Sequence, residues 1–159
     1  TELSYTFHGR DVYAYTGARL ASGVISYEEV GKELPLSEIV ELDVVETEYN
    51  KEEKSVTGCV DILDVRFGSL WTSISRDDFY LLNPEFGKRY EVSIFHEHML
   101  VYQNQVVYQH SFAEVAIGSP LLYINSVYRL GIAINQGSFA RAYNVGTGTN
   151  WKIRIRAID

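Results

Sequence analysis

Residues 6–11 hold the densest group of side chains in this chain that could do chemistry. His8 supplies an imidazole, Arg10 a guanidinium and Asp11 a carboxylate, and Gly9 separates the first two. An imidazole can accept a proton from a reacting group, and a polar turn at a helix start can direct backbone N–H groups toward a ligand. Such residues more often cap helices or form turns, so the rest of the sequence must decide between the two interpretations.

A helix is expected directly after this run. Apolar residues recur at helical spacing over residues 12–21, and Gly23 stands where a helix would end. Further along, Ser26 and Glu29 have the spacing of a capping box, which predicts a second short helix ending near Gly31. The start of the chain is therefore expected to be helical.

From residue 40 onward, apolar and polar residues alternate as they do in half-buried strands. Val, Ile and Tyr favour sheets, and clusters of Gly, Asn and Pro separate the alternating segments. Strands are expected at residues 40–44, 56–65, 90–94, 99–101, 106–108, 130–134 and 151–155. This pattern predicts a mainly β fold, with an antiparallel, barrel-like domain at residues 38–159 after a short helical segment at residues 1–37.

The charge balance narrows the class of protein. The 14 Lys and Arg residues and 21 Asp and Glu residues give a net charge of −7, so the basic footprint of a nucleic-acid-binding protein is missing. Lys152, Arg154 and Arg156 alternate near the end of the chain, which is typical of the solvent face of a strand.

Cysteine content and hydropathy point to a cytoplasmic location. Cys59 is the single cysteine, so no disulfide can form within the chain, as is usual in a reducing compartment. No apolar run approaches the roughly 20 residues that cross a bilayer, and no signal peptide is visible. We therefore expect a cytoplasmic protein with no membrane partner.

Three segments, in order along the chain, resemble one enzyme family. They are TFHGRDVYAYTGARLASG at residues 6–23, DVRFGSLWTSI at residues 64–74 and NSVYRLGIAINQGS at residues 125–138. Together they resemble the S-adenosyl-L-methionine (SAM) hydroxide adenosyltransferases, the family that also contains the SAM-dependent fluorinase and chlorinase. The resemblance implies that residues 1–37 end an N-terminal α/β domain and that residues 38–159 are the C-terminal β domain. A longer parent protein is then expected.

The resemblance implies hydrolysis of SAM to adenosine and L-methionine. Because the sulfonium is a good leaving group, a nucleophile held in line and desolvated can displace methionine at the ribose C5′. The halogenases of the family carry other residues where His8 and Gly9 stand, so His8 favours water as the nucleophile. An imidazole is too weak a base to hold standing hydroxide, so His8 would take the proton as the C–O bond forms.

The resemblance also implies a homotrimer, with each active site between the first domain of one subunit and the β domain of its neighbour. SAM is the substrate, and no cofactor or metal is expected. In the family an Asp and an Arg earlier in the first domain assist the His. We therefore expect little or no turnover from this chain by itself.

The second segment carries substrate-binding residues by resemblance. Asp64 would bind the α-ammonium of methionine, and a carboxylate also suits a cationic sulfonium substrate. Phe67 and Phe112 would form the walls of an adenine pocket. Trp71 would border that pocket or point into the barrel. Ser69 replaces the family's usual Asn and offers a shorter, simpler contact to adenine.

The third segment carries further substrate-binding residues by resemblance. Ser126 would donate a hydrogen bond to the methionine carboxylate, and Asn135 and Gln136 would present backbone groups to the base. The family often has Gly where Tyr128 stands, and the halogenases often have Arg where Val127 stands. We expect weaker carboxylate binding in consequence.

Three histidines offer an alternative, a metal site. His96 and His98 share one strand face by spacing, and a hairpin turn near residues 103–105 would place His110 opposite His98. Three imidazoles could bind zinc. No carboxylate or cysteine completes the set from sequence, so a solvated hairpin is the favoured interpretation and no metal is expected.

Two other functions remain open. Halide transfer to SAM, giving a 5′-halo-adenosine, is the alternative within the family. A non-catalytic β barrel that binds an oligonucleotide or a partner protein is the alternative outside it, although the acidic balance disfavours nucleic acid.

Overall fold

The computed structural model of the chain describes residues 7–41 and 45–158. They belong to two compact units, Thr1–Leu42 and Asp43–Asp159, which are described separately here. No helix in the described residues is both long and apolar enough to cross a membrane.

The first unit is helical, as its sequence predicts. A π-helical turn, η1 (Gly9–Ala14), continues into α1 (Tyr15–Ala21), and a 3₁₀ turn, η2 (Leu36–Glu38), follows. The helix ends as expected, with Gly23 in the left-handed region at φ 69°. None of the residues from 7 to 41 is buried.

The predicted second helix at residues 26–31 is wrong. The Ser26 backbone N–H donates to the Glu29 carboxylate over 2.8 Å, which is one half of a capping box. The residues that follow form only turns, through the Glu29 N–H to the Ser26 carbonyl and the Val30 N–H to the Tyr27 carbonyl. A short helix needs an apolar face to pack, and these residues are exposed.

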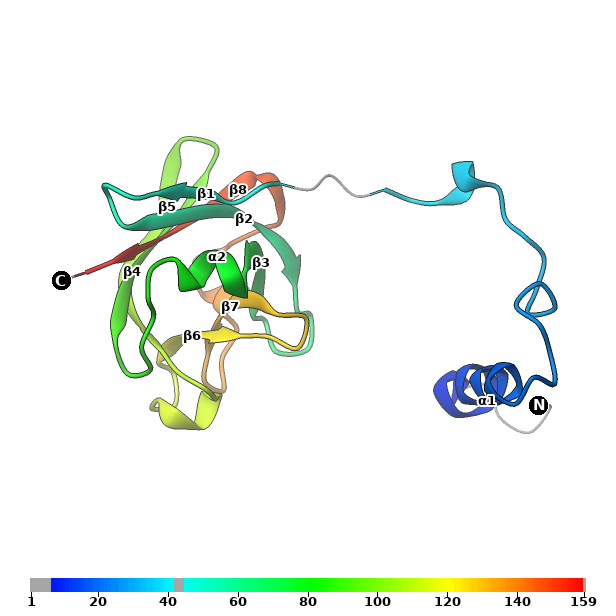
Figure 1. Cartoon of the computed structure of the whole chain (residues 1–159). Coiled ribbons are helices and arrows are strands. Elements are labelled where there is room, and N and C mark those ends of the chain that lie inside the picture. Colours follow the sequence, from blue (N-terminus) through cyan, green and yellow to red (C-terminus); the bar gives the residue numbers. More distant parts are fainter. Residues whose placement is uncertain (1–6, 42–44, 159) are drawn as a thin grey trace. The chain divides into compact units, whose positions relative to one another are not determined.

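The second unit is an eight-stranded sheet with short helices between its strands (Figure 1). The elements in chain order are β1 (Glu48–Asn50), β2 (Ser55–Leu63), β3 (Leu70–Ser75), α2 (Arg76–Tyr80), β4 (Arg89–His96), β5 (Met99–Tyr108), η3 (Phe112–Glu114), β6 (Pro120–Ile124), β7 (Arg129–Ile134), α3 (Phe139–Tyr143) and β8 (Gly148–Ala157). The strand expected at residues 40–44 is not present at 40–41, and residues 42–44 lie outside the described residues.

Pairing of β2 with β8 closes the sheet into a barrel. The order is β2-β3-β7-β6-β5-β4-β8, and β1 pairs with the first half of β2. The predicted mainly β, barrel-like fold is therefore confirmed. One pairing differs from the antiparallel expectation: β5 and β6 run parallel, with Val107 beside Leu121. The connection over residues 109–119 is long enough to carry the chain back across the barrel end before β6 begins.

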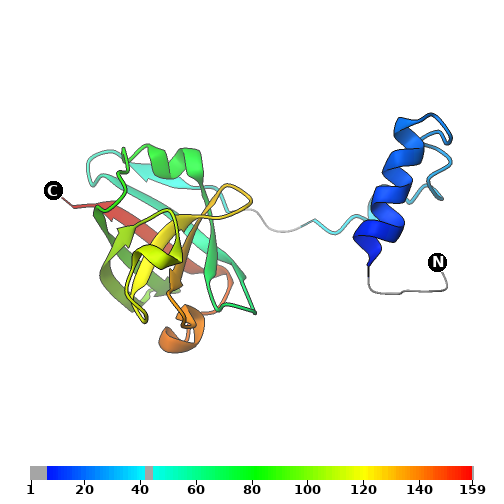
Figure 2. The ribbon, with the colours of Figure 1, turned by 90° about the horizontal axis from the view of Figure 1, so that it is seen from below.

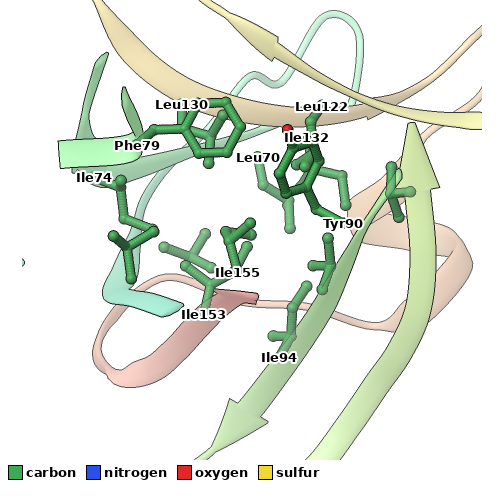
Figure 3. Close-up of a cluster of buried hydrophobic side chains, with 14 of the residues drawn as sticks. Leu70, Ile74, Phe79, Tyr90, Ile94, Leu122, Leu130, Ile132, Ile153 and Ile155 are labelled. Atoms are coloured by element: carbon green, nitrogen blue, oxygen red, sulfur yellow. The ribbon is translucent and has the colours of Figure 1, made fainter. Parts of the chain in front are cut away.

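The barrel interior is filled by apolar side chains that alternate along each strand (Figure 3). In β8, Ile153 and Ile155 are fully buried, while Arg154 and Arg156 reach Glu53 and Glu91 outside. The solvent-face prediction for these basic residues is confirmed.

Two short helices close opposite sides of the barrel. Figure 2 shows α2 in green and α3 in orange on opposite sides. Phe79 of α2 is fully buried and meets Tyr90 and Tyr108 edge-on, at ring-centroid distances of 5.4 and 5.1 Å. Phe139 of α3 is fully buried too and contacts Tyr102 at 4.9 Å. Each helix is thus anchored by one phenylalanine.

The predicted hairpin turn at residues 103–105 is wrong. β5 continues through this stretch, and the β4–β5 turn lies at Glu97 and His98, where Glu97 has a positive φ of 57°. His96 stacks on Trp151, and His110 stacks on Phe86.

Among the residues that the structure describes, no group of three or more metal-ligating side chains occurs. The three histidines of the zinc alternative therefore do not form a site in the described chain.

Candidate active site

A pocket of about 830 Å³ opens on the α3 side of the barrel. This volume is in the range of small-molecule sites. Three segments form it: the β2–β3 turn, η3, and the stretch from the end of β7 into α3. Its lining residues are Leu63, Asp64, Val65, Arg66, Phe67, Gly68, Ser69, Phe112, Ile134, Asn135, Gln136, Gly137, Ser138, Ala140 and Arg141.

Backbone hydrogen bonds fix Asp64 at the entrance of the β2–β3 turn. Its N–H donates to the Ser69 carbonyl over 2.9 Å, and its carbonyl accepts from the Gly68 N–H over 2.6 Å. Its carboxylate accepts from the Arg66 N–H over 3.0 Å. The turn therefore holds one carboxylate in a set position, where it can attract a cationic group.

Gly68 joins this turn to α3 at a place where no other residue fits. Its φ of 68° is left-handed, and a Cβ built there would lie 2.0 Å from the Ser138 hydroxyl oxygen and 2.7 Å from its Cα. The Gly68 carbonyl accepts from the Ala140 N–H over 3.0 Å. The turn and the start of α3 are thus one packed unit.

Two aromatic side chains at the pocket are unusually exposed. Phe67 is 68% exposed and Phe112 is 40% exposed. Ring faces left open to solvent in this way can stack on a planar ligand, and each stacked base contributes roughly 1–3 kcal/mol. A pocket with a carboxylate and two aromatic faces suits a cationic nucleoside.

Asn135 supports the loop that carries Phe112. Its side-chain amide donates to the Val115 carbonyl over 2.8 Å, its N–H donates to the Ser119 carbonyl, and its carbonyl accepts from the Gly118 N–H. The side-chain N–H, the backbone N–H and the backbone carbonyl of Asn135 are therefore used in hydrogen bonds within the protein. Gln136, which follows it at a positive φ of 55°, also lines the pocket.

Trp71 does not line the pocket but supports it from the neighbouring strands. Trp71, Gly131 and Tyr123 are paired across β3, β7 and β6. Because Gly131 has no side chain, the Tyr123 ring lies over it, and the Trp71 Nε1–H donates to the Tyr123 hydroxyl over 3.1 Å. The Tyr123 ring in turn contacts Phe112 at 5.1 Å.

Tyr123 is a residue that the sequence did not single out. Burial raises the pKa of its hydroxyl, against hydrogen bonds with Trp71 and Ser69 and together with the nearby Asp64 carboxylate. The hydroxyl therefore stays protonated at neutral pH and serves as a hydrogen-bonding group. Ser69 itself is 2% exposed, at the floor of the pocket.

Ser126 lies on the other side of the barrel. It is exposed in the β6–β7 turn, whose Tyr128 carbonyl accepts from the Arg76 N–H at the start of α2. The pocket begins where β7 ends, and a strand of six residues is about 20 Å long. Within the described residues, Ser126 is therefore not brought to the pocket.

His8 belongs to the first unit, where it immediately precedes η1 and is exposed. Its neighbours Arg10 and Asp11 form an ion pair, which raises the pKa of Arg10 and lowers the pKa of Asp11. These two charges therefore bind each other.

Two arginines of the pocket were also missed from the sequence. Arg66 lies within the β2–β3 turn and Arg141 within α3, and both line the pocket. The signal for Arg66 was present, since it stands between Asp64 and Phe67. Arg141 could be found only once α3 was known to pack against that turn.

The chain matches the family model for the "SAM hydroxide adenosyltransferase C-terminal domain" over residues 58–152. It belongs to this family. The match runs from within β2 to within β8 and includes every segment that lines the pocket.

Named relatives of both reaction types are similar to the chain. A protein named fluorinase from Actinopolyspora mzabensis is 30% identical over 93% of this chain and 48% of its own length. A protein named (R)-S-adenosyl-L-methionine hydrolase from Thermus thermophilus is 32% identical over 90% of this chain and 47% of its own length. The chain therefore spans about half the length of these relatives.

A solved structure shares the fold. The crystal structure of an uncharacterized conserved protein from Thermotoga maritima superposes with a TM-score of 0.62 and 29% identity, over 97% of this chain and 54% of that one.

Proposed function

We propose that the protein hydrolyses SAM to adenosine and L-methionine, by attack of water on the ribose C5′. The observation that carries the proposal is the pocket, which unites Asp64, Phe67 and Phe112 in a member of this family. The hydrolase-named relatives, at 32% and 28% identity, support the reaction class.

Several pocket residues hold the substrate in this proposal. Phe67 and Phe112 stack on adenine, Ser69 and the Gln136 backbone contact the edge of the base, and Asp64 binds the α-ammonium. Asn135 and Trp71 act indirectly. Asn135 holds the loop that carries Phe112 through its bond to Val115, and Trp71 holds the Tyr123 ring. The pocket residues bind and orient; no imidazole is among them.

His8 acts as the base in the chemical step. The water oxygen bonds to C5′ as the C5′–S bond breaks, and the electron pair of that bond goes to sulfur, so that neutral methionine leaves. The water proton passes to the imidazole as the new bond forms. No cofactor or metal is required, because the sulfonium already activates the carbon.

We further propose that the working enzyme is a homotrimer whose active sites combine the barrel of one subunit with the first domain of another. Two facts support this. The chain covers about half of each named relative, and the described pocket residues supply binding groups but no imidazole.

Halide transfer is the second candidate, because fluorinase-named relatives are 29–31% identical to this chain. His8 favours water, since a halide ion needs no base.

Product analysis separates the two reactions. The protein, produced in the longest form that its gene encodes, is incubated with SAM in buffers with and without chloride or fluoride. We expect adenosine and methionine in equal amounts under both conditions, by liquid chromatography. A 5′-halo-adenosine would establish the second candidate, and intact SAM throughout would leave a non-catalytic binding function.

A further inference from the structure

Trp71, Tyr123 and Gly131 form a small platform on the outer face of the barrel. Trp71 of β3 is paired with Gly131 of β7, and Gly131 is paired with Tyr123 of β6. Their neighbours along these strands include Leu70 and Leu122, which are fully buried in the core. Side chains alternate between the two faces of a strand, so the platform faces away from the core.

The Tyr123 ring is held at its face and at its hydroxyl. A Cβ built at Gly131 would lie 2.8 Å from both Cε1 and Cζ of Tyr123, so the ring lies directly against the β7 backbone. The Trp71 Nε1–H, which can only donate, donates to the Tyr123 hydroxyl over 3.1 Å. A close contact and a hydrogen bond on two other strands therefore set the position of the ring.

Phe112 has little support within its own segment. It begins η3, a 3₁₀ turn of three exposed residues, and turns of this kind have few internal hydrogen bonds. In the described part of the chain, Tyr123 is the one aromatic ring that contacts Phe112, with centroids 5.1 Å apart and planes inclined by 52°. Phe112 lines the pocket, whereas Tyr123 lies behind it and is not among the lining residues.

We propose that Tyr123 is a positioning residue, which holds the Phe112 ring in the orientation that stacks on adenine and acts through Phe112 without touching the substrate. This rests on the proposed function, in which Phe112 stacks on the base. A ring that is already oriented loses less conformational freedom when the substrate binds, so the platform raises affinity without adding a contact. Gly131 then influences substrate affinity from another strand, through the Tyr123 ring.

A double-mutant cycle tests the proposal by equilibrium binding of SAM. The protein is produced in the longest form that its gene encodes, in the His8→Ala background, where SAM is expected to stay intact. Tyr123→Leu removes the ring. Gly131→Ala keeps the ring but displaces it, because the three atoms nearest to the added methyl all belong to Tyr123. Each change is measured alone, with Phe112→Ala and with Phe67→Ala.

Two further variants serve as controls. Tyr123→Phe keeps the ring and removes only the hydroxyl, and Tyr49→Leu truncates a partly exposed tyrosine of β1. Circular dichroism verifies that each variant is folded at the assay temperature. If Tyr123→Leu is not folded, Gly131→Ala takes its place in the cycle.

We expect Tyr123→Leu and Gly131→Ala each to weaken SAM binding by about 2- to 10-fold, the range for loss of one aromatic contact. Once Phe112→Ala is present, neither should weaken it by more than about twofold further, because residues that act through one another are not additive. With Phe67→Ala the losses should add. Tyr123→Phe should recover most of the affinity that Tyr123→Leu loses, and Tyr49→Leu should change nothing.

Losses that add fully with Phe112→Ala would overturn the proposal, since Tyr123 would then contact SAM itself or support the barrel in general. If Phe112→Ala weakens binding but Tyr123→Leu and Gly131→Ala do not, only this proposal fails. If SAM is bound and hydrolysed but Phe112→Ala has no effect, the stacking role of Phe112 fails together with the proposal. If SAM neither binds nor reacts, the proposed function fails as well.

Discussion

The two units of the chain differ in where their apolar side chains lie. In the barrel, residues such as Phe79, Ile132 and Ile153 are fully buried. In the first unit, Tyr13 is 72% exposed and Leu36 is 84% exposed, and none of residues 7–41 is buried. The binding pocket is thus built on a core within this chain, whereas the segment that carries His8 has no such core. The proposed binding residues are therefore supported by a packed core, whereas His8, the proposed base, lies on an exposed segment.

The largest expected effect falls on the reaction. His8→Ala should lower the rate of SAM hydrolysis by about 10²–10⁴-fold while leaving SAM affinity within about twofold, because the imidazole acts on water and the barrel binds the substrate. Steady-state turnover and equilibrium dialysis measure the two quantities. Undiminished turnover would remove His8 from the mechanism.

Truncating an apolar side chain should cost much more stability in the barrel unit than in the first unit. Phe79→Ala removes a buried ring that contacts Tyr90 and Tyr108, so we expect a loss of about 3–5 kcal/mol in the free energy of unfolding. Leu36→Ala, at an exposed position, should change it by less than about 0.5 kcal/mol. Denaturant titration of both variants tests this, and a similar loss in each would show that the first unit contributes to the same core.

Removing a stacking ring should weaken substrate binding without unfolding the barrel. Phe67→Ala and Phe112→Ala should each reduce SAM affinity by about 1–3 kcal/mol, or roughly 5–150-fold. Phe86→Ala is the control, since this ring is also partly exposed but stacks on Tyr108 and His110 and does not line the pocket. Isothermal titration calorimetry gives the affinities; equal losses in all three variants would argue against stacking.

Substitutions at two glycines with positive φ test how the β2–β3 turn packs against α3. Gly68→Ala meets Ser138 as well as backbone strain, whereas Gly87→Ala, at φ 84°, meets only strain because nothing lies within 4 Å of its Cβ. We expect Gly87→Ala to cost about 1 kcal/mol of stability and Gly68→Ala about 1–3 kcal/mol more, with loss of SAM affinity. Thermal unfolding would contradict this if the two variants matched.

The smallest expected effect is on stability, and it comes from the carboxylate of Asp78 in α2, on the side of the barrel away from the pocket. Burial acts to raise the pKa of Asp78, but hydrogen bonds from the Ser75 hydroxyl and N–H outweigh it and lower the pKa below its ordinary value. A lowered pKa stabilises the fold above the pKa of the unfolded chain, and this contribution is lost as pH falls through the folded value.

Asp78→Asn should therefore cost about 1 kcal/mol at pH 7, and this cost should shrink as pH falls through the folded pKa of Asp78, because the wild-type carboxyl is then also neutral. Denaturant titrations over a series of falling pH values measure it, with the exposed Asp77→Asn as control. A pH-independent difference would mean that packing, not charge, is responsible.

The strands could be predicted because twofold alternation is a local signal that burial in the barrel enforces. The parallel β5–β6 pair could not, since it depends on a crossover over residues 109–119 that no local pattern encodes. The polar run at residues 103–105 predicts a turn. In the structure it is part of β5 and pairs with residues 91–93 of β4. Polar composition alone did not distinguish a solvated strand from a turn.

The candidate site was partly predictable for a similar reason. Asp64, Phe67 and Ser69 are close in sequence, and a single turn gathers them. Phe112 and Gln136 come from segments far along the chain, and the family resemblance alone pointed to them. Contacts such as those of Gly68 with α3, which bring Arg141 to the pocket, depend on tertiary packing and could not be anticipated.

The most direct test of the account is a crystal structure of the protein grown with SAM. We predict that the nucleoside lies between Phe67 and Phe112, with the methionine ammonium within hydrogen-bonding distance of the Asp64 carboxylate. Density for SAM elsewhere on the barrel, or a pocket that stays empty at saturating SAM, would contradict the account.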